Sequence, residues 1–184
     1  MIKLINLDVY RYFLYFVFYS FIGWAYESIY YTLRRKKPVN TGFLNICLCP
    51  IYGIGALLDI GLLSRVESVW QLFIAGILIC CTLEYIASWL LEEIFHTRWW
   101  DYSEWRFNIN GRVCLLGAFA FGTLSVLLIK FIHPMVMIYI NNLSPSVIKC
   151  LCIIALLLLC GDIISTIRNP EKFEEKLWFI NPKQ

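Results

Sequence analysis

Five apolar segments, each close to 20 residues long, fill most of this chain of 184 residues. A helix needs about 20 predominantly apolar residues to cross the hydrocarbon core of a bilayer. Apolar residue types make up 60% of the chain, against about 45–50% in soluble domains. We therefore expect an all-α, polytopic membrane helix bundle of about five transmembrane helices, forming a single membrane domain over residues 1–184. The expected spans are residues 9–33, 43–63, 69–95, 113–132 and 147–167.

The second segment is the weakest of the five, because Pro50, Gly53, Gly55 and Gly61 interrupt it and Asp59 is charged. It is either a kinked span or a re-entrant hairpin buried in protein. With five spans, one side of the membrane carries eleven Lys and Arg residues and the other side five. With a re-entrant second segment the counts become seven and nine. Because positive charge collects on the cytoplasmic side, the count favours five spans, with the N-terminus outside and the C-terminus in the cytoplasm.

An aromatic cytoplasmic loop and a tail complete the predicted topology. The loop over residues 96–112 reads HTRWWDYSEWRFNINGR, and such amphipathic rings prefer the headgroup layer. In the tail, residues 168–184, Asn169 can cap a helix that has Pro170 at its first position. Phe173, Leu177 and Ile180 would share one face of it. We expect a short amphipathic helix lying on membrane lipids.

Carboxylates inside the apolar segments are the clearest functional signal. A charged side chain at the bilayer centre costs at least about 2.5–3.5 kcal/mol, so it usually faces protein or water and often marks function. Glu27 shares a helix face with Ser20 and Gly23, and Glu84, Ser88 and Glu92 recur every fourth residue. We expect a polar, cytoplasm-facing cavity with arginines as counter-ions. Its predicted lining residues are Glu27, Glu84, Ser88, Glu92, Arg98, Asp101 and Arg112. The alternative is that these carboxylates are struts that only pair helices.

Other kinds of site find little support in the chain. The eight cysteines lie almost entirely in apolar segments, where Cys acts as a small hydrophobe. The pairs Cys47/Cys49 and Cys150/Cys152 do not have zinc-site spacing, and neither histidine adjoins them. We expect no metal and no cofactor. The basic residues cluster at segment ends and form no stripe for nucleic acid, and the sequence holds no P-loop, HExxH or GxSxG motif.

Four runs of sequence resemble a known family. They are FYSFIGWAYE from Phe18, NTGFLNICLCPIYGIGALL from Asn40, EYIASWLLEEIFHTRWWDYS from Glu84 and FNINGRVCL from Phe107. Together they resemble the family named Putative ABC-transporter type IV, small bacterial membrane proteins also called CmpB-like permeases. The resemblance adds Trp24, Asn108 and Asn110 to the candidate site. The chain departs from the family pattern RGFLNGPxCPIYG, with Thr41 in place of Arg and Ile46-Cys47 in place of Gly-Pro.

The leading functional hypothesis is therefore a transport protein of the bacterial plasma membrane, a permease-like subunit that moves a small solute through the polar cavity. The resemblance implies a separate ABC ATPase on the cytoplasmic face, with the WWDYS loop as its contact. So small a chain would have to form a homo-oligomer, and no internal repeat supports alternating access within one chain. One alternative is a membrane-embedded lipid-modifying enzyme, with Glu27, Glu84 and Asp101 as acid–base groups and Arg98 and Arg112 holding a phosphate headgroup. The other is a non-catalytic scaffold or regulator. The absence of enzyme motifs makes a non-enzyme the preferred reading.

Overall fold

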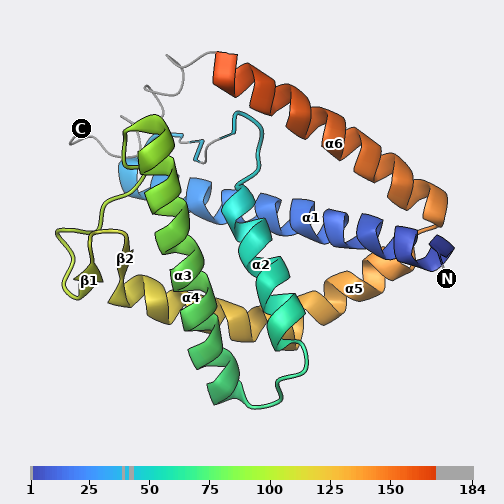
Figure 1. The fold of residues 1–184 in the computed structure, drawn as a ribbon, viewed down its shortest axis with the longest axis horizontal. Coiled ribbons are helices and arrows are strands. Elements are labelled where there is room, and N and C mark those ends of the chain that lie inside the picture. Colours follow the sequence, from blue (N-terminus) through green and yellow to red (C-terminus); the bar gives the residue numbers. More distant parts are fainter. Residues whose placement is uncertain (1, 39, 42–43, 169–184) are drawn as a thin grey trace. The chain divides into compact units, whose positions relative to one another are not determined.

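The chain forms a nearly all-α structure with one small β-hairpin (Figure 1). This computed structural model describes residues 2–38, 40–41 and 44–168. Its elements are α1 (Ile2–Arg35), α2 (Pro50–Leu63), α3 (Val69–Phe95), β1 (Asn108–Ile109), β2 (Val113–Cys114), α4 (Leu115–Leu127), a π-helical turn η1 (Leu128–Ile132), α5 (His133–Asn141) and α6 (Pro145–Arg168). The all-α class predicted from the sequence is confirmed.

The chain divides into two compact units, and each is described by itself. Within the described residues, the first comprises residues up to 57 together with residues 135–168, and the second comprises Leu58–Pro134. In the first unit α1 packs along α6, and the Cys152 thiol lies 3.3 Å from the carbonyl oxygen of Tyr10. In the second unit α3 and α4 pack along each other.

Small residues allow the helices of both units to approach closely, as is usual between membrane helices. A methyl group on Gly23 of α1 would collide with the ring of Tyr52 in α2, and one on Gly53 would collide with Ser20. In the second unit, a methyl group on Gly76 of α3 would meet the side chain of Ser125 in α4. Side chains on these helices therefore lie in direct contact with the neighbouring helix.

Three helical stretches are long and apolar enough to cross a membrane in the part of the chain that the structure describes. They are Val69–Phe95, Leu115–Asn141 and Pro145–Thr166. Helix α1 is 34 residues long but is not one of the three, since its many tyrosines lower its hydropathy. These stretches are those of a membrane protein. Helices α1 and α2 do not meet the same criterion of length and apolarity.

The helix at the fourth predicted span, residues 113–132, has different bounds. Val113 and Cys114 form a β-strand, and the helix begins at Leu115 and continues to Asn141. The predicted end at Ile132 coincides with the π-helical turn, where the N–H of His133 donates to the carbonyl of Leu128. A π turn widens the helix by one residue, and the helix continues through Pro134, which has no N–H to donate.

The second predicted span, residues 43–63, is helical only from Pro50 onward. Proline suits the first turn of a helix and disfavours helical backbone in the residue before it. A helix of 14 residues is about 21 Å long, which is shorter than the roughly 30 Å hydrocarbon core. The predicted surface helix after Arg168 lies outside the described residues.

Candidate functional site

A tight hairpin between α3 and α4 presents the arginine of the NINGR run. Strands β1 and β2 pair antiparallel, and the N–H of Arg112 donates to the carbonyl of Ile109 at 3.0 Å. The two residues between Ile109 and Arg112 have positive φ, 53° at Asn110 and 70° at Gly111. Positive φ at both central positions defines a type I′ turn, which Asn-Gly favours. This turn fixes the direction in which Arg112 leaves the hairpin.

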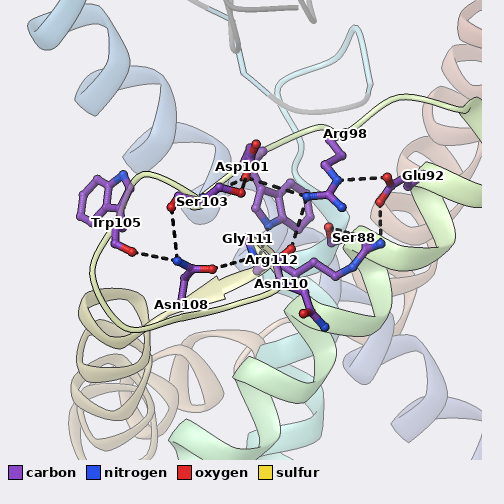
Figure 2. A network of polar contacts seen from close by, with 11 residues as sticks. Ser88, Glu92, Arg98, Asp101, Ser103, Trp105, Asn108, Asn110, Gly111 and Arg112 are labelled. Atoms are coloured by element: carbon purple, nitrogen blue, oxygen red, sulfur yellow. Dashed lines mark hydrogen bonds and ion pairs between the residues drawn. The ribbon is translucent and has the colours of Figure 1, made fainter.

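Two arginines bind one carboxylate of α3 (Figure 2). The Nε of Arg98 donates to Oε1 of Glu92 at 3.0 Å, and Nη2 of Arg112 lies 2.5 Å from Oε2 of the same side chain. Arg112 also donates to the hydroxyl of Ser88 at 3.1 Å, and its guanidinium lies over the ring of Tyr85. The Arg112 side chain is only 11% exposed. The arginines are therefore counter-ions, as the sequence predicted, and they tie the hairpin to α3.

The rest of the loop is held by hydrogen bonds from polar side chains (Figure 2). Asp101 accepts from the backbone N–H of Ser103 at 2.9 Å and from its hydroxyl at 2.5 Å. The Ser103 hydroxyl is the main reason that the pKa of Asp101 is lowered, and the charge of Arg98 adds to the effect. Asn108 donates to the carbonyl of Trp105 and accepts from the N–H of Gly111. Asp101 and Asn108 thus shape the loop.

Deeper along α3, the carboxyl group of Glu84 belongs to the same network. It is 8% exposed and accepts from the hydroxyl of Tyr102 at 3.1 Å. Tyr102 is held in turn by its N–H, which donates to the carbonyl of Gly111. Asn110 donates to the hydroxyl of Tyr85 at 2.9 Å. Tyr102 therefore ties Glu84 to the loop, and Asn110 ties the hairpin to α3.

In the first unit, Glu27 of α1 meets the beginning of α2. Its Oε1 accepts from the hydroxyl of Tyr52 at 2.9 Å, and its Oε2 lies 3.9 Å from the thiol of Cys49. Among the residues that the structure describes, no ion pair involves Glu27. Trp24, one turn earlier, donates to the side chain of Asn40 at 2.6 Å. Glu27 is thus held by neutral donors, in contrast to Glu92.

A second carboxylate of the first unit fixes the segment before α2. Asp162 of α6 is 9% exposed, and its Oδ2 accepts from the backbone N–H of Asn45 at 2.7 Å and that of Ile46 at 3.4 Å. The side chain of Asn45 also donates to the hydroxyl of Thr166 at 2.9 Å. Asp162 therefore anchors the non-helical approach to Pro50, a role that is structural.

The structure brings eight of the ten predicted site residues together in the second unit. They are Glu84, Ser88, Glu92, Arg98, Asp101, Asn108, Asn110 and Arg112. Glu27 and Trp24 belong to the other unit. The predicted site did not include Tyr52, Tyr85 and Tyr102, whose hydroxyls bind site residues, although all three stand in the runs that carry the family resemblance. A groove in the second unit is apolar apart from Thr82, and no predicted site residue lines it.

The comparisons with known proteins give one match. A family model described as Putative ABC-transporter type IV matches residues 14–167. Neither the search of curated proteins nor the search of solved structures gives a match. The matched range covers all the residues of the network and Glu27.

Proposed function

The chain belongs to the family described as Putative ABC-transporter type IV, and from this membership and the site we propose that it is a permease-like transport protein. It moves a small solute through a polar path inside the membrane, and a carboxyl group on α1 exchanges protons during transport. The family name and the three apolar helices support the membrane and transporter parts of this proposal. The carboxyl contacts support the rest.

The observation that carries the proposal is the contrast between Glu27 and Glu92. Glu92 is paired with two arginines, so adding a proton there would leave guanidinium charge unpaired. Glu27 meets a phenol and a thiol, which are neutral hydrogen-bond donors. A carboxyl group held by neutral donors can bind and release a proton without breaking an ion pair. We therefore assign the exchanging role to Glu27 and a structural role to Glu92.

In the proposed topology five segments cross the bacterial plasma membrane, with the N-terminus outside and the C-terminus in the cytoplasm. The eleven-to-five distribution of Lys and Arg supports it. Within this arrangement α2 is an interrupted span whose non-helical half is residues 44–49, packed on protein by Asp162. Broken helices at membrane depth are tolerated only when protein or a cavity covers them, and they often form transporter sites.

A separate ABC ATPase is the proposed partner, docking on the loop between α3 and α4. Trp99 is 5% exposed and Trp100 donates to the carbonyl of Arg112, so this part of the WWDYS run serves the loop itself. Trp105, Phe107 and Ile109 are exposed. They are the residues of the loop that offer an ATPase an apolar contact.

Proton flux into vesicles tests the transport proposal. The purified chain is reconstituted into liposomes that contain a pH-sensitive dye, and a potassium diffusion potential drives protons inward. We expect acidification with the wild-type protein and its loss in Glu27→Gln. Glu67→Gln, which changes an exposed acid between α2 and α3, is the matched control and should retain the flux. Wild-type flux no greater than that of empty liposomes, or full flux in Glu27→Gln, would refute the proposal.

A scaffold or regulator is the second candidate, and the Glu92 network favours it. A carboxylate held by two arginines fixes helix and hairpin without any chemistry. On this reading the chain carries no proton flux, and Glu27→Gln and Glu84→Gln lose a protein partner in pull-down experiments. The enzyme alternative has less support, because both arginines that would hold a lipid phosphate are engaged by Glu92.

A further inference from the structure

The second unit holds a buried carboxyl group that the proposed function does not use. Asp59, near the end of α2, is 2% exposed. Its oxygens lie 3.8 and 4.0 Å from the thiol of Cys80 in α3. The same thiol lies 3.9 Å from the hydroxyl of Ser125 in α4, which is 1% exposed. Three helices thus bring a carboxyl, a thiol and a hydroxyl group together inside one unit.

This cluster lies deep along the two membrane-crossing helices. Cys80 is eleven residues from the start of α3, or about 16 Å along the helix axis, and Ser125 is about 15 Å from the start of α4. Half of the hydrocarbon core is about 15 Å. The cluster is therefore near the bilayer midplane, the depth at which transporters bind substrates and coupling ions.

No fixed positive charge compensates Asp59 among the described residues. The ion pairs of that part of the chain do not include Asp59. Lys130, the basic residue of the π-helical turn, donates to the carbonyl of Val66 at 3.2 Å. Glu84, one turn beyond Cys80 on α3, accepts from Tyr102. The partners of Asp59 in that part of the chain, the thiol of Cys80 and the hydroxyl of Ser125, are neutral, and a thiol is a weak donor.

We propose that Asp59, with Cys80 and Ser125 around it, is a second proton-exchange site at the membrane midplane. In this step the carboxylate binds one proton to become a neutral acid and releases it again, with no other bond made or broken. A metal is a poorer fit, because the described residues contain no group of three His, Cys, Asp or Glu side chains suited to one. A single carboxylate in apolar surroundings is most simply neutralised by a proton. The proposal deepens the transport function proposed above and rests on it for its biological role.

Carbodiimide labelling tests the site without any transported solute. Dicyclohexylcarbodiimide is apolar and adds to protonated carboxyl groups, so peptide mass spectrometry of the labelled full chain reports which acids carry a proton. We expect an adduct on Asp59 whose yield falls about tenfold for each pH unit above the midpoint of titration. The adduct should be absent in Asp59→Asn, present in Asp59→Glu and unchanged in Glu67→Gln. Replacing choline with sodium ions in the buffer should not protect Asp59 from labelling.

Three results would overturn the proposal. The first is the absence of an adduct on Asp59 at every pH at which Glu27 is labelled. The second is an adduct whose yield does not change with pH. The third is protection of Asp59 from labelling by sodium ions, which would indicate a cation site instead. If Asp59→Asn fails to fold, the pH dependence of labelling in the wild-type protein and in Asp59→Glu still tests the proposal. If the labelling experiment fails while the Glu27-dependent proton flux is intact, only the proposed site at Asp59 is overturned. Titration of Asp59 without any flux overturns only the transport proposal.

Discussion

Adding one methyl group at Gly23 should dislodge the side chain that binds Glu27. In Gly23→Ala the new Cβ would overlap the Cβ, Cγ and Cδ2 atoms of Tyr52. The Cβ and Cγ atoms lie on the axis about which the ring turns, so a rotation of the ring cannot remove the collision. Helix α2 has to shift relative to α1, and the 2.9 Å hydrogen bond from the Tyr52 hydroxyl to Glu27 lengthens.

The size of the effect follows from three contributions. Overpacking a well-packed site costs about 1–3 kcal/mol. Losing a buried hydrogen bond to an ionisable group costs about 1.5–3 kcal/mol. Replacing Gly by Ala inside a helix returns about 0.5–1 kcal/mol. The free energy of unfolding should therefore fall by about 1.5–5.5 kcal/mol, which for a chain of this length lowers the melting temperature by roughly 3–20 °C.

The assay follows thermal unfolding in detergent through a dye that fluoresces on reaction with thiols. All eight cysteines are free, and Cys49 beside Glu27 is 7% exposed. Gly61→Ala is the matched control, because a methyl group there meets nothing within 4 Å. Tyr52→Phe removes only the hydroxyl and should cost about half as much as Gly23→Ala. Tyr52→Gly removes both the Cβ and the ring, so adding it to Gly23→Ala should relieve the collision, and the two costs should not be additive.

The reasoning fails if Gly23→Ala and Gly61→Ala melt at the same temperature. It also fails if the costs of Gly23→Ala and Tyr52→Gly add within about 0.5 kcal/mol, because independent sites add in this way. Either result would mean that the contact between Gly23 and Tyr52 does not hold α1 against α2.

The remaining predictions concern the loop and the Asp162 anchor. Gly111→Ala puts a side chain at φ 70° and against Asp101 and Ser103, so strain of about 1–2 kcal/mol plus lost hydrogen bonds should lower the melting temperature. Because the pKa of Asp101 is lowered in the folded chain, its stabilising contribution should be complete above the unfolded value of about 3.9 and be lost as pH falls through the folded pKa. Melting temperatures measured against pH should show this loss in the wild-type protein and a smaller one in Ser103→Ala. Asp162→Asn should free the segment before Pro50, and faster maleimide labelling of the buried Cys49 would show it.

The sequence predicted the helices of the fold better than their ends. Apolarity and length located α3 and α6 closely, since a bilayer demands both properties. The same apolarity extends over Val113 and Cys114, which form a strand, because a short apolar run does not distinguish strand from helix. The Asn-Gly pair at 110–111 is a strong hairpin signal and would have located the turn. In the second segment Pro50 marked the true helix start.

The candidate site was predictable where helical spacing brings residues together. Glu84, Ser88 and Glu92 lie on one face of α3, and the arginines that follow that helix were correctly expected to be counter-ions. The contact between Asp162 and the backbone of Asn45 joins positions 117 residues apart. Periodicity within one helix carries no information about such a pair, so only the folded chain reveals it.

The buried and half-buried acids of this chain differ in what compensates them, and that difference orders them by role. Glu92 has two guanidinium groups, and Asp162 has two backbone N–H groups that cannot move away without unfolding a segment. Glu27 and Asp59 have hydroxyl and thiol partners, which can rotate as a proton arrives or leaves. Since only the second kind can change charge at small structural cost, carbodiimide should label Glu27 and Asp59 in the folded protein and leave Glu92 and Asp162 unmodified. Equal labelling of all four acids would show that the compensating groups do not decide which carboxyl groups exchange protons.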